Sequence, residues 1–157
     1  MRRLYLLLGM ILALVLLAGC EGDQLFTGSQ WDVGDNHVSF SHGVAELDTA
    51  GNRLLLKFDL ISGSSYPTAQ ATVENISTLS VNQSREVTVR LSLSQSETFE
   101  SKPADTEATA TIIFTRFDIS PFGGVTGTIE GMARSIENPG DAPVLLEASF
   151  TDVPITN

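Results

Sequence analysis

The chain has 157 residues, with 9 basic and 19 acidic side chains and a formal charge of −10 at pH 7. So acidic a surface disfavours nucleic acids and anionic lipid headgroups as partners, because both carry negative charge. The length suits one globular domain.

The first twenty residues have the order of a secretory signal. Two arginines follow Met1, and the run from Leu4 to Leu17 is almost wholly apolar. The small residues Ala18 and Gly19 then come directly before Cys20. A positive segment, an apolar run and small residues in this order are typical of a cleaved signal peptide. The apolar run is shorter than the roughly 20 residues that a transmembrane helix needs.

The stretch Leu17-Ala18-Gly19-Cys20 resembles the lipobox of bacterial lipoproteins. The resemblance implies cleavage between Gly19 and Cys20 and attachment of a diacylglyceryl group to the thiol of Cys20. Residues 1–19 would then be a lipoprotein signal peptide, and lipid chains would hold the mature N-terminus to a membrane. Two alternatives remain open, an ordinary signal peptide with a chance cysteine and an uncleaved anchor.

Residue 21 is glutamate. In enterobacterial lipoproteins an aspartate at this position marks retention at the inner membrane. The resemblance therefore implies a place in the cell envelope on the periplasmic side of the outer membrane. Cleavage would also remove two arginines and change the formal charge from −10 to −12. Once Cys20 is acylated, no thiol is left for a disulfide, a thiolate metal site or a cysteine nucleophile.

The mature chain begins with a segment that has little periodicity. Residues 20–30 are rich in turn formers, and we expect them to form a lipidated tether. We expect residues 31–157 to form a single β-domain that begins at Trp31, because a lone tryptophan is usually a packing anchor.

The first part of this domain alternates between apolar and polar residues. Val38–Leu47 alternates in two opposite phases, which predicts a strand with a bulge near His42-Gly43. A turn over 48–52 leads to an alternating strand over 53–60. We expect the two strands to form a hairpin.

The middle of the domain contains an ambiguous segment, a clear strand and a loop. Residues 62–84 combine helical spacing with a strand-like composition, so a short helix and a strand both stay open. Residues 86–94 alternate regularly and predict a strand. Residues 95–106 are polar and acidic and predict a loop.

The last third predicts three further strands. Residues 108–119 are apolar on both faces, which indicates either a strand covered on both sides or a bulge near Phe114. Residues 125–134 carry Gly127 and Gly131 on the inward face, where glycine indicates a close approach or a bend. A turn over 138–141 precedes a closing strand over 144–150.

Together these segments predict an all-β domain of about seven or eight strands joined by short turns. We expect an antiparallel β-sandwich, because the inward faces are uniformly apolar. A small closed β-barrel is the alternative, since both architectures give the same alternation.

Few residues indicate a binding site for a metal or cofactor. Asp32, Asp35 and Asn36 are weak candidates for calcium, which takes roughly six to eight oxygen ligands, and we expect a simple turn there. His37 and His42 lie five residues apart on an extended segment and would face opposite sides, so we expect no shared metal site. We expect no cofactor, since no phosphate-binding loop or catalytic serine motif is found in the sequence.

Three functions remain as hypotheses. The first is a non-enzymatic binding or structural lipoprotein, in which an edge strand over Val38–Leu47 pairs with an envelope protein. The second is a lipocalin-like carrier of a small apolar ligand, with room made by Gly127 and Gly131. The third is a hydrolase that uses carboxylates, for which Asp59, Asp118 and Asp152 are the candidates. We favour the first, because the sequence carries no catalytic signature.

Overall fold

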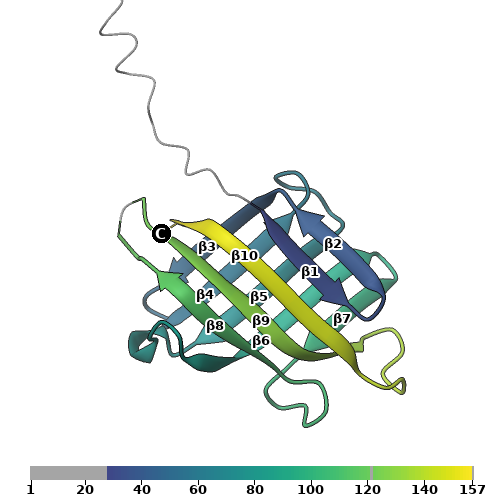
Figure 1. Cartoon of the computed structure of the whole chain (residues 1–157). Coiled ribbons are helices and arrows are strands. Elements are labelled where there is room, and N and C mark those ends of the chain that lie inside the picture. The colour runs from purple at the N-terminus through teal and green to yellow at the C-terminus, as the bar shows by residue number, and fades with distance from the viewer. Residues whose placement is uncertain (1–27, 121, 157) are drawn as a thin grey trace, which may run out of the picture.

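The computed structural model describes residues 28–120 and 122–156. Their strands form a closed β-barrel with one additional strand and one additional hairpin (Figure 1). The predicted all-β class is confirmed, and of the two predicted architectures the barrel is the one observed. The predicted signal peptide, the lipobox and Cys20 lie outside the described residues.

Ten strands and one short 3-10 helix make up the regular structure of the described residues. In chain order they are β1 (Ser29–Val33), β2 (Asn36–Phe40), β3 (His42–Asp48), β4 (Arg53–Asp59), β5 (Thr68–Glu74), η1 (Ile76–Thr78), β6 (Ser84–Ser94), β7 (Glu97–Ser101), β8 (Ala110–Phe117), β9 (Gly124–Ser135) and β10 (Val144–Thr156).

The barrel closes through one parallel pair of strands. Its ring runs β10-β3-β4-β5-β6-β7-β9 and returns from β9 to β10. A closed ring with an odd number of strands cannot be antiparallel throughout, because each antiparallel step reverses the strand direction. The exception here lies between β10 and β3, which run parallel and pair Ile155 with Ala45 and Thr156 with Glu46.

Two layers of strands cross one another around the core, one containing β1, β10, β9 and β8 and the other β3 to β7 (Figure 1). Long strands belong to both layers. Residues 84–87 of β6 pair with β8, whereas residues 89–94 pair with β7. Such shared strands join two sheets at their corners and turn a sandwich into a barrel.

The β1–β2 hairpin lies outside the ring. Its first strand, β1, pairs with β10, and β2 pairs only with β1. The turn between them has two residues, with Gly34 at φ +55° in its first position. Glycine suits that place, because primed hairpin turns need a positive φ there.

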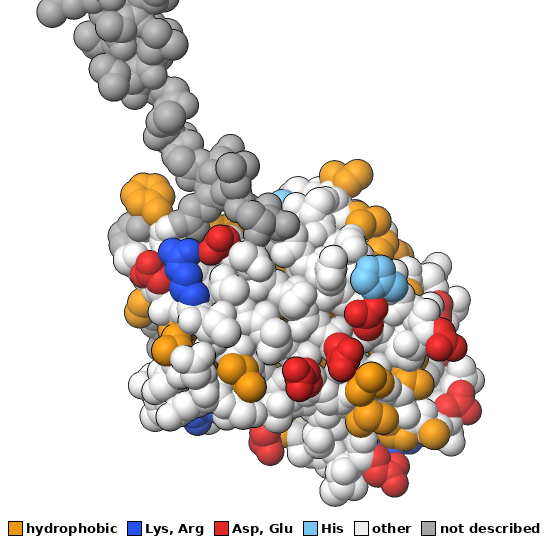
Figure 2. Space-filling model, in the orientation of Figure 1, with side chains coloured by type: hydrophobic (Ala, Val, Ile, Leu, Met, Phe, Trp, Pro, Cys, Tyr) orange, Lys and Arg blue, Asp and Glu red, His pale blue; other side chains and the backbone are white. Residues whose placement is uncertain are grey.

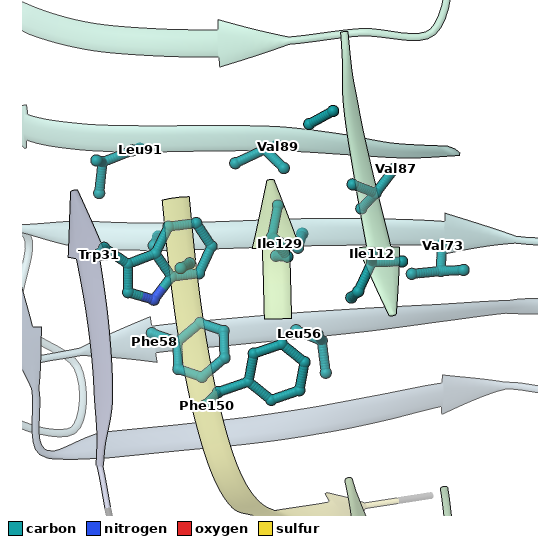
Figure 3. Packing of buried hydrophobic residues seen from close by; sticks show 14 of the residues in the cluster. Trp31, Leu56, Phe58, Val73, Val87, Val89, Leu91, Ile112, Ile129 and Phe150 are labelled. Carbon is teal, nitrogen blue, oxygen red and sulfur yellow. The ribbon is translucent and has the colours of Figure 1, made fainter. Parts of the chain in front are cut away.

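Aromatic rings tie this hairpin to the barrel (Figure 3). Trp31 is fully buried, with its ring centroid 5.4 Å from that of Phe58 in β4. Phe58 lies 5.9 Å from Phe150 of β10, and Phe150 lies 6.0 Å from Phe114 of β8. The expected role of Trp31 as a packing anchor is confirmed, because its ring bridges β1 to both layers.

The predicted bulge near His42-Gly43 is wrong. Ser41 separates two strands, since β2 pairs with β1 and β3 pairs with β4. The opposite phases on either side of Ser41 arise because the chain leaves the outer hairpin and enters the barrel wall. The predicted bulge near Phe114 is confirmed by a register shift between Phe114 and Arg116.

Two strands were not expected. Strand β1 starts at Ser29, two residues before the expected start of the domain. Strand β7 occupies Glu97–Ser101, inside the segment expected to be a loop. In the ambiguous segment 62–84, both alternatives occur, as strand β5 followed by helix η1.

Candidate functional site

Gly28 is the first described residue and leads into β1. We call the end of the barrel at which β1 begins the tether end. The carbonyl of Gly28 accepts a hydrogen bond from the amide of Thr151 in β10, at 3.4 Å. Gly28 and Thr151 also line a surface hollow of about 410 Å³ with Phe40 and Ser41. The tether end therefore brings together the start of β1, the junction of β2 with β3, and the middle of β10.

Hydroxyl groups line this hollow. Gln30 lies directly opposite Ser39 of β2 on one side and Ser149 of β10 on the other. All three are exposed and line the hollow together with Ser29. Neutral hydroxyl and amide groups donate and accept hydrogen bonds, so this surface suits a polar neighbour such as a peptide backbone.

The outer edge of β2 adjoins this hollow. Val33 and Asn36 close the two-residue turn as a hydrogen-bonded pair, and bonded and non-bonded pairs alternate along the ladder. His37 and Ser39 consequently direct their backbone N–H and C=O groups away from β1. Among the described residues no strand pairs with that edge.

The predicted edge strand is therefore too long. Val38 belongs to the edge strand β2, but Leu47 belongs to β3, which lies in the barrel wall between β4 and β10. Only the residues before Ser41 are available for pairing by strand addition.

Two of the three candidate carboxylates come together at the tether end. Arg116 lies 2.7 Å from Asp152 and 3.7 Å from Asp118. The hydroxyl of Ser120 donates to Asp118 at 2.6 Å and its amide at 3.0 Å. Hydrogen bonds from the Ser120 hydroxyl and amide, with the nearby charge of Arg116, hold the pKa of Asp118 below its usual value. Asp118 therefore stays ionised at neutral pH.

The third candidate, Asp59, faces His42. The two residues are direct cross-strand neighbours in β4 and β3, with Nδ1 of His42 2.8 Å from Oδ1 of Asp59. The other carboxylate oxygen accepts a hydrogen bond from the amide of Gly63. The pair joins the start of β3 to the end of β4 and fixes the beginning of the following loop.

The weak calcium candidates lie at the tip of the outer hairpin. Asp32 is the direct cross-strand neighbour of His37, and its carboxylate lies 2.5 Å from Nδ1 of that ring. Asp35 lies in the turn, and Asn36 begins β2. Each histidine thus pairs with a different aspartate. Within residues 28–120 and 122–156, no group of three or more His, Cys, Asp and Glu side chains could hold a metal ion.

The two inward glycines lie where the backbone of β8 approaches β9. A β-carbon on Gly127 would meet the carbonyl oxygen of Ile113 and lie 3.0 Å from the ring of Phe150. One on Gly131 would meet the carbonyl oxygen of Thr109 and the backbone of Ala110. The expected close approach is confirmed, and neighbouring atoms fill the space around both glycines.

One polar cluster was not found from the sequence. Arg134 lies 2.7 Å from Glu107 and 3.3 Å from Asp105, and it donates to the carbonyl oxygen of Asp141. Hydrogen bonds to Glu107 and then to Asp105 raise the pKa of Arg134. Asp105 and Glu107 lie in the acidic stretch after β7. The cluster ties this loop to the loop before β10.

No family model, curated protein or solved structure matches this chain. In the described part of the chain, no helix has both the length and the apolar character needed to cross a membrane.

Proposed function

We propose that the chain is a lipid-anchored lipoprotein of the cell envelope, on the periplasmic side of the outer membrane, and that its barrel is a non-enzymatic binding module. The anchor rests on the lipobox-like sequence ending at Cys20. The partner is an extended segment of another envelope protein, which adds a strand to β2.

The observation that carries this proposal is the outer edge of β2. The N–H and C=O groups of His37 and Ser39 point away from β1, which gives an extended peptide two residues with which to pair. Natural edge strands are often protected by lysine or proline, and β2 contains neither. The hydroxyl-lined hollow beside Ser39 offers further hydrogen bonds to such a segment.

Substitutions at Ser39 test the proposal. Proline at this position removes an outward N–H while the hydrogen-bonded pairs between β1 and β2 remain. Alanine removes the hydroxyl but keeps the N–H, so Ser39→Ala is the matched control. Native mass spectrometry of the mature protein, extracted gently from its own membranes, measures both the acyl mass on Cys20 and any second polypeptide.

We expect wild type and Ser39→Ala to carry the second polypeptide and Ser39→Pro to lose it. Equal retention by Ser39→Pro would contradict pairing at β2. A wild-type protein without any second polypeptide would contradict the binding function. An N-terminus without acyl chains would remove the anchor.

A further inference from the structure

Two loops of this acidic protein contain few charges and expose large apolar side chains. One connects β4 to β5 and has no charged residue from Leu60 to Pro67. The other connects β8 to β9 and has none from Ile119 to Gly123. The exposed apolar or aromatic side chains of the two loops are Leu60 at 41%, Ile61 at 75%, Tyr66 at 45%, Ile119 at 54% and Phe122 at 78% of full exposure.

Contacts place the first loop at the tether end. The hydroxyl of Ser41 donates to the carbonyl of Leu60, and Ser41 lines the same hollow as Gly28. The loop therefore begins beside the point where the described chain enters β1.

The second loop reaches the tether end from the other side. The amide of Ile155 in β10 donates to the carbonyl of Gly123 in the loop. Arg116 forms ion pairs with Asp118 and Asp152. Asp152 follows Thr151, which lines the hollow at the tether end. Figure 1 shows the connection between β8 and β9 at the same end of the barrel as the start of β1. Figure 2 shows exposed hydrophobic side chains among the mostly polar surface of the domain.

The backbone holds Phe122 in an unusual conformation. Its φ is +69°, in the left-handed region that bulky side chains rarely adopt. Hydrogen bonds on both sides fix the turn, from Gly123 to the carbonyl of Ser120 and from Asp118 to the carbonyl of Gly124. The loop thus presents an aromatic ring to solvent from a fixed, strained turn, which is a feature of functional loops.

We infer that these two loops contact the lipid bilayer, so that the tether end faces the membrane. The inference rests on the proposed anchor at Cys20. Gly28 is eight residues after Cys20, so even a fully extended chain keeps the tether end within about 29 Å of the anchored residue. Within that distance even a weak contact between the loops and the bilayer is favoured, because the lipid anchor already holds the domain at the membrane surface.

The chemistry of the loops fits a lipid surface. Apolar and aromatic side chains partition into the interface between headgroups and acyl chains. The acidic remainder of the domain is repelled by anionic headgroups, whereas the loop tips at Ile61 and Phe122 carry no charge. Exposed apolar side chains grouped at one end are a recognised mark of an interaction surface.

A dye that reports contact with acyl chains tests the inference. The mature acylated protein is reconstituted into phosphatidylcholine vesicles with a fluorophore on a single introduced cysteine, either Ile61→Cys or Phe122→Cys. Cys20 does not compete for the label, because its thiol is acylated. Quenching is measured with lipids brominated on their acyl chains.

Two exposed apolar residues far from the tether end provide matched controls. Leu145 is 55% exposed, and its carbonyl accepts a hydrogen bond from Gly34, at the far tip of the outer hairpin. Ile136 is 42% exposed and follows the far end of β9, the strand that begins at Gly124. The variants Leu145→Cys and Ile136→Cys carry the same dye.

We expect dyes at 61 and 122 to lose about half of their emission on brominated vesicles, since interfacial side chains reach about 5–10 Å into the bilayer. Dyes at 136 and 145 should lose none. If all four dyes stay unquenched while Cys20 is acylated and the protein floats with the vesicles, the inference fails and the anchor stands. If Cys20 carries no lipid, both fail. Shielding of positions 61 and 122 only when a second protein is added would also overturn the inference.

Discussion

Gly127 of β9 lies directly against β8, with the carbonyl oxygen of Ile113 in the space that a β-carbon would need. The ring of Phe150 and the backbone of Phe114 enclose the same position. Any side chain at 127 must therefore push apart the two strands that hold the aromatic core.

We predict that Gly127→Ala destabilises the domain by about 1–3 kcal/mol, the usual cost of adding a methyl group to a packed interior. Gly140 provides the control, because no heavy atom lies within 4 Å of the β-carbon position there. Urea unfolding followed by the fluorescence of the single tryptophan measures both variants. Equal midpoints for the two would show that β8 and β9 separate without cost.

The indole N–H of Trp31 depends on one partner. It donates to the hydroxyl of Ser29 at 3.2 Å, and both residues are buried. Ser29→Ala should cost about 1–3 kcal/mol, because a buried donor left without an acceptor keeps its desolvation penalty. Ser149→Ala removes an exposed hydroxyl from the neighbouring strand and should leave the free energy of unfolding unchanged. A neutral Ser29→Ala would mean that another acceptor reaches the indole.

Arg134 holds two loops together through Glu107, Asp105 and the carbonyl of Asp141. Lysine keeps the positive charge, but it lacks the planar guanidinium group whose fixed N–H donors reach several acceptors at once. We predict that Arg134→Lys lowers the thermal unfolding midpoint and increases proteolysis in both loops. Arg90→Lys, at an exposed position of β6, is the control. Unchanged proteolysis in Arg134→Lys would show that charge alone joins the loops.

The pKa of Asp118 lies below its usual 3.8, chiefly because the Ser120 hydroxyl and amide donate to it. As the pH falls, the unfolded chain therefore binds the proton first. The stabilisation from this carboxylate is fully present above about pH 4 and is lost as the pH falls through the lower folded-state pKa.

We predict that Asp118→Asn reduces the dependence of the unfolding midpoint on pH in this acidic range. Circular dichroism melts at a series of pH values measure the slope. Glu147→Gln, on the exposed face of β10, controls for the loss of one negative charge. An Asp118→Asn slope as steep as that of wild type would assign the acid sensitivity to other carboxylates.

The strands that sequence alone predicts well are those with apolar residues on one face. Val87, Val89 and Leu91 are buried in β6, as their alternation indicates. Strand β7 escaped prediction because its two buried side chains, Thr98 and Ser101, are polar and lie on opposite faces of the strand. Thr98 and Ser101 are buried and satisfied by hydrogen bonds to Ser92 and to the carbonyl of Ala108.

Barrel closure could not be predicted from alternation, since a sandwich gives the same pattern. The deciding feature is that β6, β9 and β10 span 11, 12 and 13 residues and so reach both layers. At the tether end, Asp118 and Asp152 were found as candidates, but Arg116 between them was not. Their meeting depends on how β8 and β10 are placed around β9, which no local spacing encodes.

Strand β10 pairs with β1, β3 and β9, although it is the last described strand to leave the ribosome. The β1–β2 hairpin is made first, yet Trp31 has no cover from β10 until more than a hundred further residues have followed. Contacts so distant in sequence slow folding and leave apolar surface exposed in the meantime. The β-domain therefore completes its core only after β10 has been made, and Trp31 at its start depends on the strand that is synthesised last among those described.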